Sequence, residues 1–397
     1  MASERELDVI VYGATGFTGR LVAEYLVSRL SGQDAPRWAM AGRSEAKLEE
    51  VRSSIGAPSG APLIVADAAD SAALRAMAER TRVVISTVGP YQLYGSPLVE
   101  ACVASGTGYV DLCGEPAWMR DMIDAHEAAA RASGARIVFS CGFDSIPFDC
   151  GIEQLQKRCL EAWGTPARRI KGRVRAMRGT FSGGTAASMK ATLAAAVRRP
   201  PLLKLLADPF ALTPGFSGPS QPNTLLPHFD PTVGAWVAPF IMAPINTKNV
   251  HRTNFLRGHR YGTDFLYDEM IVAGLGDLGK AAAEMIAKFN PLSSDKGPKP
   301  GEGPSREERE SGFYDILFVA EADRKEGLRL AVKGDRDPGY GSTSKMISEA
   351  ALCLAGEAPQ QGGFWTPGAL MGDALVKRLV EHAGLTFEME PASKAAA

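Results

Sequence analysis

The feature that most constrains the fold is a regular alternation of short apolar runs and helix-length runs in residues 7–140. The predicted strands span 7–12, 38–42, 63–67, 82–88, 108–112 and 135–140, and the predicted helices 18–30, 44–55, 71–80, 97–105 and 119–133. Strands that alternate with helices over short connections predict a parallel sheet with right-handed crossovers and helices on both faces. We therefore expect an α/β fold in which residues 1–150 form a doubly wound parallel sheet.

A glycine-rich turn joins the first predicted strand to the first predicted helix, in Gly13-Ala14-Thr15-Gly16-Phe17-Thr18-Gly19. The first glycine permits a tight turn, the second lets backbone approach a pyrophosphate, and the third lets helix and strand pack closely. Free amides at the helix start and the helix dipole favour an anion there. Because the motif follows an apolar strand and opens a helix, it predicts a Rossmann dinucleotide-binding domain in which these seven residues contact the cofactor.

The second predicted strand ends in Ala41-Gly42-Arg43-Ser44, where an NAD-specific site usually carries an acidic residue. An arginine suits a 2′-phosphate instead, because its planar guanidinium can hold phosphate bidentately, with Ser44 and Lys47 as further donors. This predicts NADP(H) as the cofactor; the alternative is a solvated surface arginine. Asp67, at the end of the third strand, is a candidate for contact with adenine and equally for a turn or helix cap.

The carboxyl ends of the later strands are predicted to line the nicotinamide half of the cofactor, since ligands of open parallel sheets bind there. The expected cofactor contacts are Val88, Gly89, Pro90, Tyr91, Cys113 and Gly114. The candidate catalytic residues at the same edge are Tyr94, Asp144 and Ser145. Tyr94 or Ser145 can donate a hydrogen bond to a substrate carbonyl, and Asp144 can orient a water. A turn-building role before Pro147 stays open for Asp144 and Ser145.

The alternation stops after residue 151, so residues 151–340 are predicted to form a second, α+β domain with an antiparallel sheet. The expected elements are a strand at 172–177, helices at 185–198, 267–289, 341–355 and 368–383, and a hairpin of 313–322 with 327–333. Proline-rich residues 200–231 predict a long irregular segment, and residues 293–311 an exposed mobile loop. The apolar segments 202–212 and 236–245 belong either to a pocket for an acyl chain or to ordinary core.

Charge and cysteine usage exclude several classes of function. The chain has 44 Lys and Arg against 45 Asp and Glu, so its charge does not indicate a nucleic-acid partner. The six cysteines lack CxxC spacing and the histidines form no HExxH, so we expect no metal and reduced, buried thiols. No apolar run has the length of a transmembrane helix and no signal peptide is evident, which predicts a cytoplasmic protein. Peripheral contact with a membrane and a homodimer both stay open.

Several motifs together resemble those of the saccharopine dehydrogenase-like oxidoreductases, and among these the bacterial trans-acting enoyl reductases. The residues that carry the resemblance are 11–19, 41–44, 88–91, 109–115, 142–147, 182–188 and 363–368. The resemblance implies an NADP-binding first domain, substrate determinants in the second, and a C-terminal helical segment, 341–397, that packs back on the first.

The resemblance and the motifs predict an NADPH-dependent reductase of an enoyl C=C bond in a lipid or polyketide-type acyl substrate. Two alternatives stay open. One is a saccharopine-type amino-acid dehydrogenase or reductase, whose substrate carboxylates need several cations. The other is a non-catalytic NADP-binding sensor or scaffold.

Overall fold

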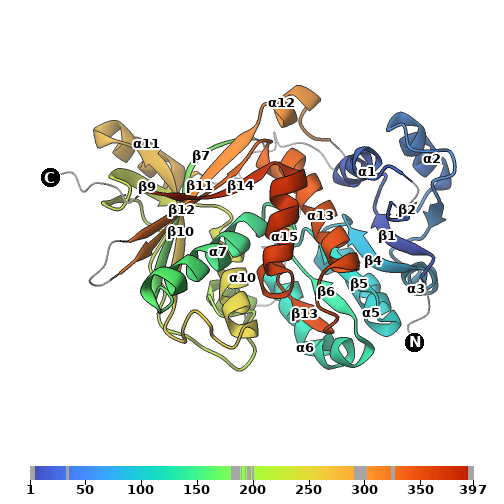
Figure 1. Cartoon of the computed structure of the whole chain (residues 1–397), viewed down its shortest axis with the longest axis horizontal. Helices are drawn as coiled ribbons and strands as arrows, with labels where there is room; N and C mark the ends of the chain where they lie inside the picture. The colour runs from blue at the N-terminus through green and yellow to red at the C-terminus, as the bar shows by residue number, and fades with distance from the viewer. Residues whose placement is uncertain are drawn as a thin grey trace.

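A computed structural model describes residues 5–32, 35–179, 201–289, 302–322 and 327–391, together with isolated residues between 188 and 198. The described chain forms two seven-stranded sheets, which Figure 1 shows on opposite sides of the molecule with helices between and around them. None of the helices in these ranges is long and apolar enough to cross a membrane.

The first sheet is the doubly wound parallel sheet that the alternating pattern predicts. Its strands are β1 (Leu7–Tyr12), β2 (Trp38–Gly42), β3 (Leu63–Val65), β4 (Thr81–Ser86), β5 (Gly108–Asp111), β6 (Arg136–Val138) and β13 (Gly363–Trp365). They follow the order β13-β6-β5-β4-β1-β2-β3, and every neighbouring pair is parallel. The chain leaves β1 toward β2 on one side and returns as β4 on the other, so the glycine-rich turn lies at the point where the strand order reverses.

Helices cover this sheet, as the sequence pattern predicts. They are α1 (Phe17–Arg29), α2 (Glu45–Ser54), α3 (Ser71–Glu79), the short α4 (Tyr91–Tyr94), α5 (Ser96–Ser105) and α6 (Pro116–Ser133). Strand β13 was not predicted: it has three residues and pairs in parallel with β6, Phe364 facing Ile137. A strand this short carries no period-2 signal, and only its place in the sheet identifies it.

The second sheet is mixed and mostly antiparallel. Its strands are β7 (Arg169–Arg178), β8 (His228–Asp230), β9 (Ala235–Pro239), β10 (Leu266–Gly274), β11 (Phe313–Glu321), β12 (Leu328–Gly334) and β14 (Leu385–Glu390), in the order β14-β12-β11-β7-β10-β9-β8. Only β7 and β10 pair in parallel. The predicted hairpin is confirmed, since β11 and β12 are antiparallel neighbours. Helix α7 (Ile146–Trp163) leads from the first sheet and packs on β11, where a β-carbon at Gly151 would lie 2.5 Å from the Phe318 ring.

Three predictions in the second half are wrong. The helix expected over 267–289 is strand β10 followed by helix α11 (Gly276–Lys288). The acidic pair Asp268 and Glu269 suggests a helix locally, but in β10 the two carboxyls bond to side chains of other elements, and this tertiary pairing overrides local propensity. The segment 200–231 contains α9 (Pro201–Ala207) and β8. Of the loop predicted over 293–311, residues 293–301 lie outside the described residues, and the remainder contains α12 (Arg306–Glu310), which begins at a Ser305–Glu308 capping box.

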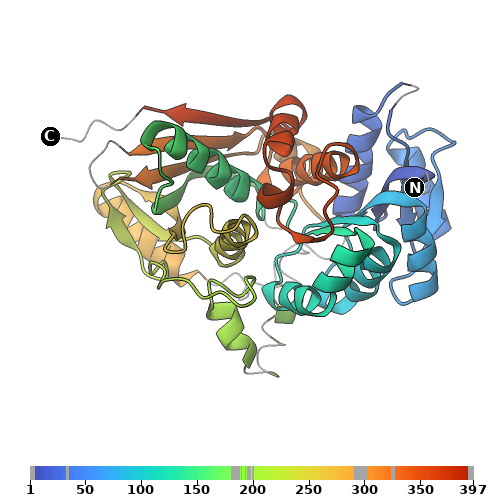
Figure 2. The same ribbon diagram turned by 60° about the horizontal axis from the view of Figure 1, so that its bottom comes forward.

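Helix α10 (Ala243–Leu256) is largely buried, and Figure 2 shows it in yellow near the middle of the molecule, between the two sheets. Nothing in the apolar pattern predicts it. Most of its buried side chains are polar: Asn246, Lys248, Asn249, His251, Arg252, Thr253 and Asn254. A helix without an apolar stripe gives no amphipathic signal, so only its partners explain its position.

The last part of the chain contributes to both sheets. Besides β13 and β14 it forms η1 (Pro338–Ser342), α13 (Thr343–Gly356), α14 (Pro367–Leu370), α15 (Gly372–Arg378) and η2 (Leu379–Ala383). Helix α13 packs on α1, and Glu349 of α13 is fully buried there. Its carboxylate pairs with Arg29 Nε at 3.0 Å and Arg378 Nη2 at 2.6 Å, and it accepts a hydrogen bond from the Tyr25 hydroxyl at 2.7 Å. This cluster fixes the far end of the helix that starts at the glycine-rich turn.

Removal of the Glu349 carboxylate should destabilise the protein strongly, because two arginines would keep their charges in a partly buried site without a counter-charge. We expect Glu349→Ala to lower the free energy of unfolding by about 3–5 kcal/mol. Glu357 also binds Arg378 but is exposed, so Glu357→Ala should cost less than about 1 kcal/mol. Urea denaturation of both variants measures the difference, and equal losses would contradict this account of the cluster.

Candidate functional site

The glycine-rich turn brings the start of α1 into direct contact with the end of β1. Gly13 has φ +89°, and a β-carbon there would lie 2.7 Å from both Thr87 Oγ1 and Val88 Cγ2. A β-carbon at Gly19 would lie 2.1 Å from the Gly13 carbonyl oxygen. No side chain fits at either position, so the helix can begin this close to the strand only with glycine.

The first turn of α1 is arranged to receive an anion. Its N-cap residue, Gly16, provides no side-chain cap, and the first turn has no acidic residue. Among the described groups, none accepts a hydrogen bond from the amides of Phe17 and Thr18. Free amides at the positive end of a helix dipole suit a diphosphate, so this part of the chain fits the predicted cofactor.

The side chains of the turn point to different surroundings. Ala14 is buried, and Thr15 lies at the end of β2, 3.7 Å from where a β-carbon on Gly42 would be. Thr18 is partly exposed. The Phe17 ring packs edge-on against Tyr340, at 4.7 Å between centroids. Phe17 therefore anchors the turn on η1, and its backbone amide remains for the cofactor.

The residues predicted to bind the adenosine half gather at the ends of β1, β2 and β3. Arg43 is exposed, and it takes part in none of the ion pairs among the described residues. Burial raises the pKa of Tyr12 to about 12, with the Asp67 charge adding to the shift and Arg43 opposing it, so both charges lie close to this tyrosine. Asp67 Oδ1 accepts from the Ala69 amide at 2.9 Å and thus also forms a local turn.

Ser44 and Lys47 lie at the start of α2, next to Arg43. The Ser44 hydroxyl caps the helix by accepting from the Lys47 amide, at 3.5 Å. The Lys47 side chain is exposed. The structure therefore places Arg43, Ser44 and Lys47 together on one surface, as a 2′-phosphate site requires.

The nicotinamide half of the predicted site follows β4. Val88 contacts Gly13, and Gly89 and Pro90 lead into α4. Tyr91 is buried, and its hydroxyl donates to the Ser86 carbonyl and accepts from the Leu112 amide, both at 3.1 Å. The Tyr91 side chain is thus committed to joining β4 and β5, which leaves the backbone of residues 88–90 to face a cofactor. Tyr94 is 47% exposed at the other end of α4, away from this buried network.

A buried carboxylate, Glu115, holds the turn before α4 in place. Its Oε1 accepts from the Tyr91 amide and its Oε2 from the Gln92 amide, both at 2.9 Å. Its Oε1 also accepts from the Ser188 hydroxyl at 2.7 Å. The position of Glu115 before Pro116 predicts the start of a helix; its bonds to α4 were not predicted, since no local pattern relates the end of β5 to a helix that begins 24 residues earlier.

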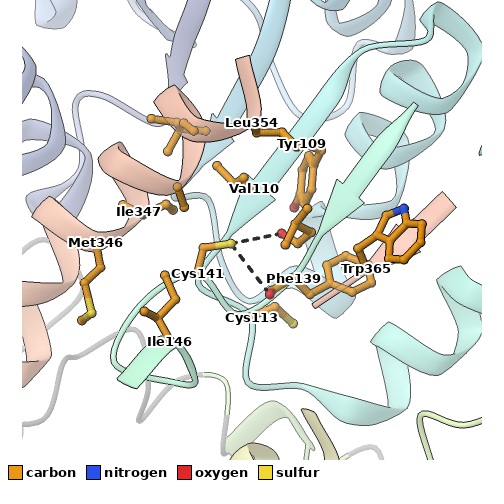
Figure 3. Close-up of a cluster of buried hydrophobic side chains, with 14 of the residues drawn as sticks. Tyr109, Val110, Cys113, Phe139, Cys141, Ile146, Met346, Ile347, Leu354 and Trp365 are labelled. Carbon is orange, nitrogen blue, oxygen red and sulfur yellow. Dashed lines mark hydrogen bonds between the residues drawn. The ribbon is translucent and has the colours of Figure 1, made fainter. Parts of the chain in front are cut away.

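A second buried carboxylate, Asp111, joins the ends of β5 and β6. Its Oδ1 accepts from the Cys113 amide at 3.0 Å and from the Ser140 amide at 2.9 Å. Burial raises the pKa of Asp111 to about 7. Figure 3 shows Cys113, which follows β5, and Cys141, which follows β6, among apolar side chains that include Ile146. Burial also raises the pKa of the Cys113 thiol well above its usual value, so Cys113 is a packed thiol rather than a nucleophile.

Asp144 and Ser145 follow β6 and face the second sheet. A β-carbon at Gly114 would lie 3.9 Å from Asp144 Oδ2, so the carboxyl reaches the end of β5. Burial raises the pKa of Asp144 to about 7, and no described side chain or amide is hydrogen-bonded to its carboxyl. Ser145 is fully buried, and its hydroxyl accepts from Asn249 Nδ2 at 2.9 Å. Of the three candidate catalytic residues, the structure brings Asp144 and Ser145 together and leaves Tyr94 apart.

Helix α10 and strand β10 supply a polar cluster that the sequence analysis missed. Asn246 Nδ2 donates to Glu269 Oε2 at 2.9 Å, and the Tyr267 hydroxyl donates to Glu269 Oε1 at 2.8 Å. Burial raises the pKa of Glu269 well above its usual value, with Asp144 among the charges that add to the shift. Glu269 therefore lies near Asp144, across the boundary between the two halves of the chain.

Two amide oxygens in this cluster are orphaned. Asn246 Oδ1 and Asn249 Oδ1 are buried and accept from no described group. Each unpaired buried acceptor costs roughly 1–3 kcal/mol, which favours a partner that comes from outside the protein. The sequence did contain one indication of this site, the unbroken polar run 246–249. On a helix, its two asparagines lie on the same face because they are three residues apart.

Other sequence features do not extend the site. Residues 182–187, which carry part of the family resemblance, and most of the predicted helix 185–198 lie outside the described residues. The six cysteines are free and buried. Over the described ranges, no group of His, Cys, Asp and Glu side chains could hold a metal ion.

Comparison with protein families agrees with the geometry of the cofactor site. Residues 9–138 match the family model of the saccharopine dehydrogenase NADP-binding domain. This range contains β1 to β6 and with them the glycine-rich turn, Arg43 and the ends of β4 and β5.

Similar sequences extend over almost the whole chain. A Mycobacterium tuberculosis protein, provisionally named a trans-acting enoyl reductase, is 39% identical over 95% of this chain and 96% of its own length. A trans-acting enoyl reductase of Mycobacterium bovis is 37% identical over the same shares of both chains. Among solved structures, the saccharopine dehydrogenase of Saccharomyces cerevisiae aligns with TM-score 0.55 and 11% identity, over 97% of this chain and 99% of that one. This last likeness concerns the fold alone.

Arg43 should decide between the two forms of the cofactor, because its guanidinium is the free cation at the predicted 2′-phosphate position. We expect Arg43→Ala to weaken NADPH binding about 10- to 100-fold and to leave NADH binding unchanged. Arg75→Ala, at an exposed arginine of α3, is the matched control and should change neither. Fluorescence titration of both nucleotides measures the effect, and a wild-type preference for NADH would contradict the assignment.

Proposed function

Because the chain belongs to the saccharopine dehydrogenase-like family that includes the mycobacterial trans-acting enoyl reductases, we propose that it reduces an enoyl C=C bond of an acyl-chain substrate with NADPH. The observation that carries the proposal is the carboxyl group of Asp144, which is hydrogen-bonded to no described group and lies at the carboxyl edge of the cofactor-binding sheet. Its pKa of about 7 is near that of an efficient general acid at neutral pH.

The residues that would hold NADPH are those of the first sheet. The amides of Phe17 and Thr18 suit the diphosphate, Arg43 with Ser44 and Lys47 suits the 2′-phosphate, and the backbone after β4 and β5 suits the ribose and nicotinamide. Bound NADPH supplies a hydride, which in enoyl reduction is taken up by the β-carbon of the substrate. The protein must then hold the substrate and provide a proton for the α-carbon.

Asp144 is the described group best suited to provide that proton. It is protonated in half of the molecules near pH 7, and no other group of the described chain is bonded to its carboxyl. Since Asp144 is partly exposed, solvent can return the proton after each turnover. Ser145 is a positioning residue in this proposal: its hydroxyl fixes Asn249, and its amide donates to the Ser140 carbonyl at 2.8 Å, which shapes the loop that carries Asp144.

We propose that the enzyme works in the cytoplasm, where NADPH and reduced thiols are ordinary. Six free, buried cysteines suit a reducing compartment. A small-molecule or acyl-chain substrate fits the activity of the named relatives. A homodimer and peripheral contact with a membrane stay predictions, which light scattering and vesicle flotation would test.

The proposed activity can be tested with a simple enoyl thioester. The purified protein with NADPH and S-crotonyl-N-acetylcysteamine should consume NADPH and form the saturated thioester, which mass spectrometry identifies. NADPH consumption with an α-keto acid and an amine, but with no enoyl thioester, would select an amino-acid dehydrogenase instead. Tight NADPH binding without turnover of any substrate would favour the sensor or scaffold.

The pH dependence of this reaction should report the Asp144 carboxyl. Only the protonated acid can deliver a proton, so kcat/KM should be constant below pH 7 and fall about tenfold per pH unit above it. Asp144→Asn should lower kcat roughly 10²- to 10⁴-fold and abolish this fall, because no acid remains to titrate. Asp121→Asn, at an exposed position on α6, serves as the control. If kcat/KM of Asp144→Asn still falls above pH 7 as in the wild-type protein, another group delivers the proton.

A further inference from the structure

The two orphaned amides of α10 lie on one face of the helix, at the boundary between the sheets. Asn246 and Asn249 are fully buried and three residues apart, so their side chains are neighbours. Each is held by one hydrogen bond from Nδ2, Asn246 to Glu269 and Asn249 to Ser145. Each Oδ1 is buried without a partner among the described groups. One hydrogen-bonding end of each amide therefore remains for a ligand.

Either end of these amides can face that ligand. The partner of Asn249 is a hydroxyl, which can donate as well as accept. The partner of Asn246 is the Glu269 carboxyl, whose pKa burial raises, and a carboxyl in its protonated form can donate as well as accept. If Ser145 and Glu269 donate to the Oδ1 atoms, each amide is rotated by half a turn and its Nδ2 group faces the ligand. Asn246 and Asn249 then offer one N–H donor each. Two such donors suit one carbonyl oxygen, which accepts through two lone pairs.

Neither the lysine nor the arginine of α10 is left free to pair with an anionic ligand. The two basic side chains on α10 are bonded elsewhere: Lys248 Nζ donates to the carbonyls of Leu206 and Pro244, and Arg252 donates to those of Leu212 and Phe364. The nearest acidic groups are Asp144 and Glu269. Either one, when ionised, would repel a carboxylate group of the ligand. An uncharged oxygen function is therefore favoured over a carboxylate.

We propose that Asn246 and Asn249 form the subsite that receives the uncharged carbonyl oxygen of the substrate, a thioester or ketone conjugated to the double bond, and that this subsite rejects free acids. The inference rests on the proposed reductase function and narrows its substrate class. During reduction negative charge develops on this oxygen as the enolate forms, and two fixed N–H donors stabilise it. The same oxygen then lies near Asp144, which protonates the α-carbon and restores the carbonyl.

Calorimetry on the NADP⁺-loaded full chain tests the subsite without turnover. The probes are S-butanoyl-N-acetylcysteamine, a saturated thioester, and butanoate, the corresponding free acid. We expect the wild-type protein to bind the thioester and not the acid, and Asn249→Leu to lose thioester binding while NADPH binding is unchanged. Equal binding of acid and thioester, or no binding of the thioester, would overturn the proposal.

Stability and turnover separate this role from a purely structural one. Replacing an amide that is only half bonded should leave the thermal midpoint of Asn249→Leu unchanged or higher, whereas kcat/KM for the crotonyl thioester falls about 10²- to 10³-fold. Asn254, on the same helix, has both amide ends bonded, to Gly262 and Tyr261. The control Asn254→Leu should therefore lower the midpoint and keep kcat/KM.

The outcomes also separate this inference from the proposed function. Thioester binding that depends on Asn249, without NADPH consumption, would reject the reductase function alone. NADPH consumption that survives in Asn249→Leu would reject the subsite alone. If both Asn249→Leu and Asn249→Ala fail to fold, Asn249 is structural and the subsite inference is wrong.

Discussion

The contact between the Gly19 backbone and the Gly13 carbonyl is the constraint on which the rest of the structure depends. It lets α1 start directly on the end of β1, where a β-carbon would lie 2.1 Å from a carbonyl oxygen. The free amides of α1 then face the carboxyl edge of the sheet, at the point where the strand order reverses. The other end of α1 is tied to α13 through Glu349, so the C-terminal part of the chain supports the helix that forms the cofactor site.

Buried carboxylates shape the remainder of this edge. Glu115 bonds to two amides of α4, Asp111 to amides after β5 and β6, and Asp149 to the Gly368 amide at 2.7 Å. In each case a carboxylate on one segment fixes the backbone of another that is distant in sequence. Burial of such groups is costly unless donors surround them, and these amides supply the donors. Asp144 differs from all three, because its carboxyl has no such donor among the described groups, and this difference identifies it as a group free to act on a substrate.

The sequence was sufficient for the first half of the fold and for the position of the glycine-rich turn in it, and less so for the rest. Alternating apolar runs predicted β1 to β6 because strands buried on both faces are continuously apolar. The glycine-rich turn and Arg43 were predictable because their chemistry is local. Strands β10 and β13 were missed for different reasons: acidic residues of β10 find partners on other elements, and β13 is too short to show a period. The contacts of Glu115 with α4 and of Asn249 with Ser145 were missed because they join residues 24 and 104 positions apart.

Some side chains of helix α10 hold the fold together, and others are left to bind a ligand. A polar helix between two sheets is unfavourable unless its polar groups are bonded. Lys248 and Arg252 donate to backbone carbonyls and Thr253 donates to Asp149, whereas His251 Nε2 has no partner among the described groups. Had the whole helix served only to join the two halves, Asn246 and Asn249 would be expected to be satisfied in the same way. They are half bonded, on one face, and near Asp144, to whose carboxyl no described group is hydrogen-bonded. The two half-bonded amides on one face of this helix therefore point to the place where the protein leaves its interactions for a ligand to complete, whereas the orphaned His251 Nε2 belongs to a ring that packs on Phe210.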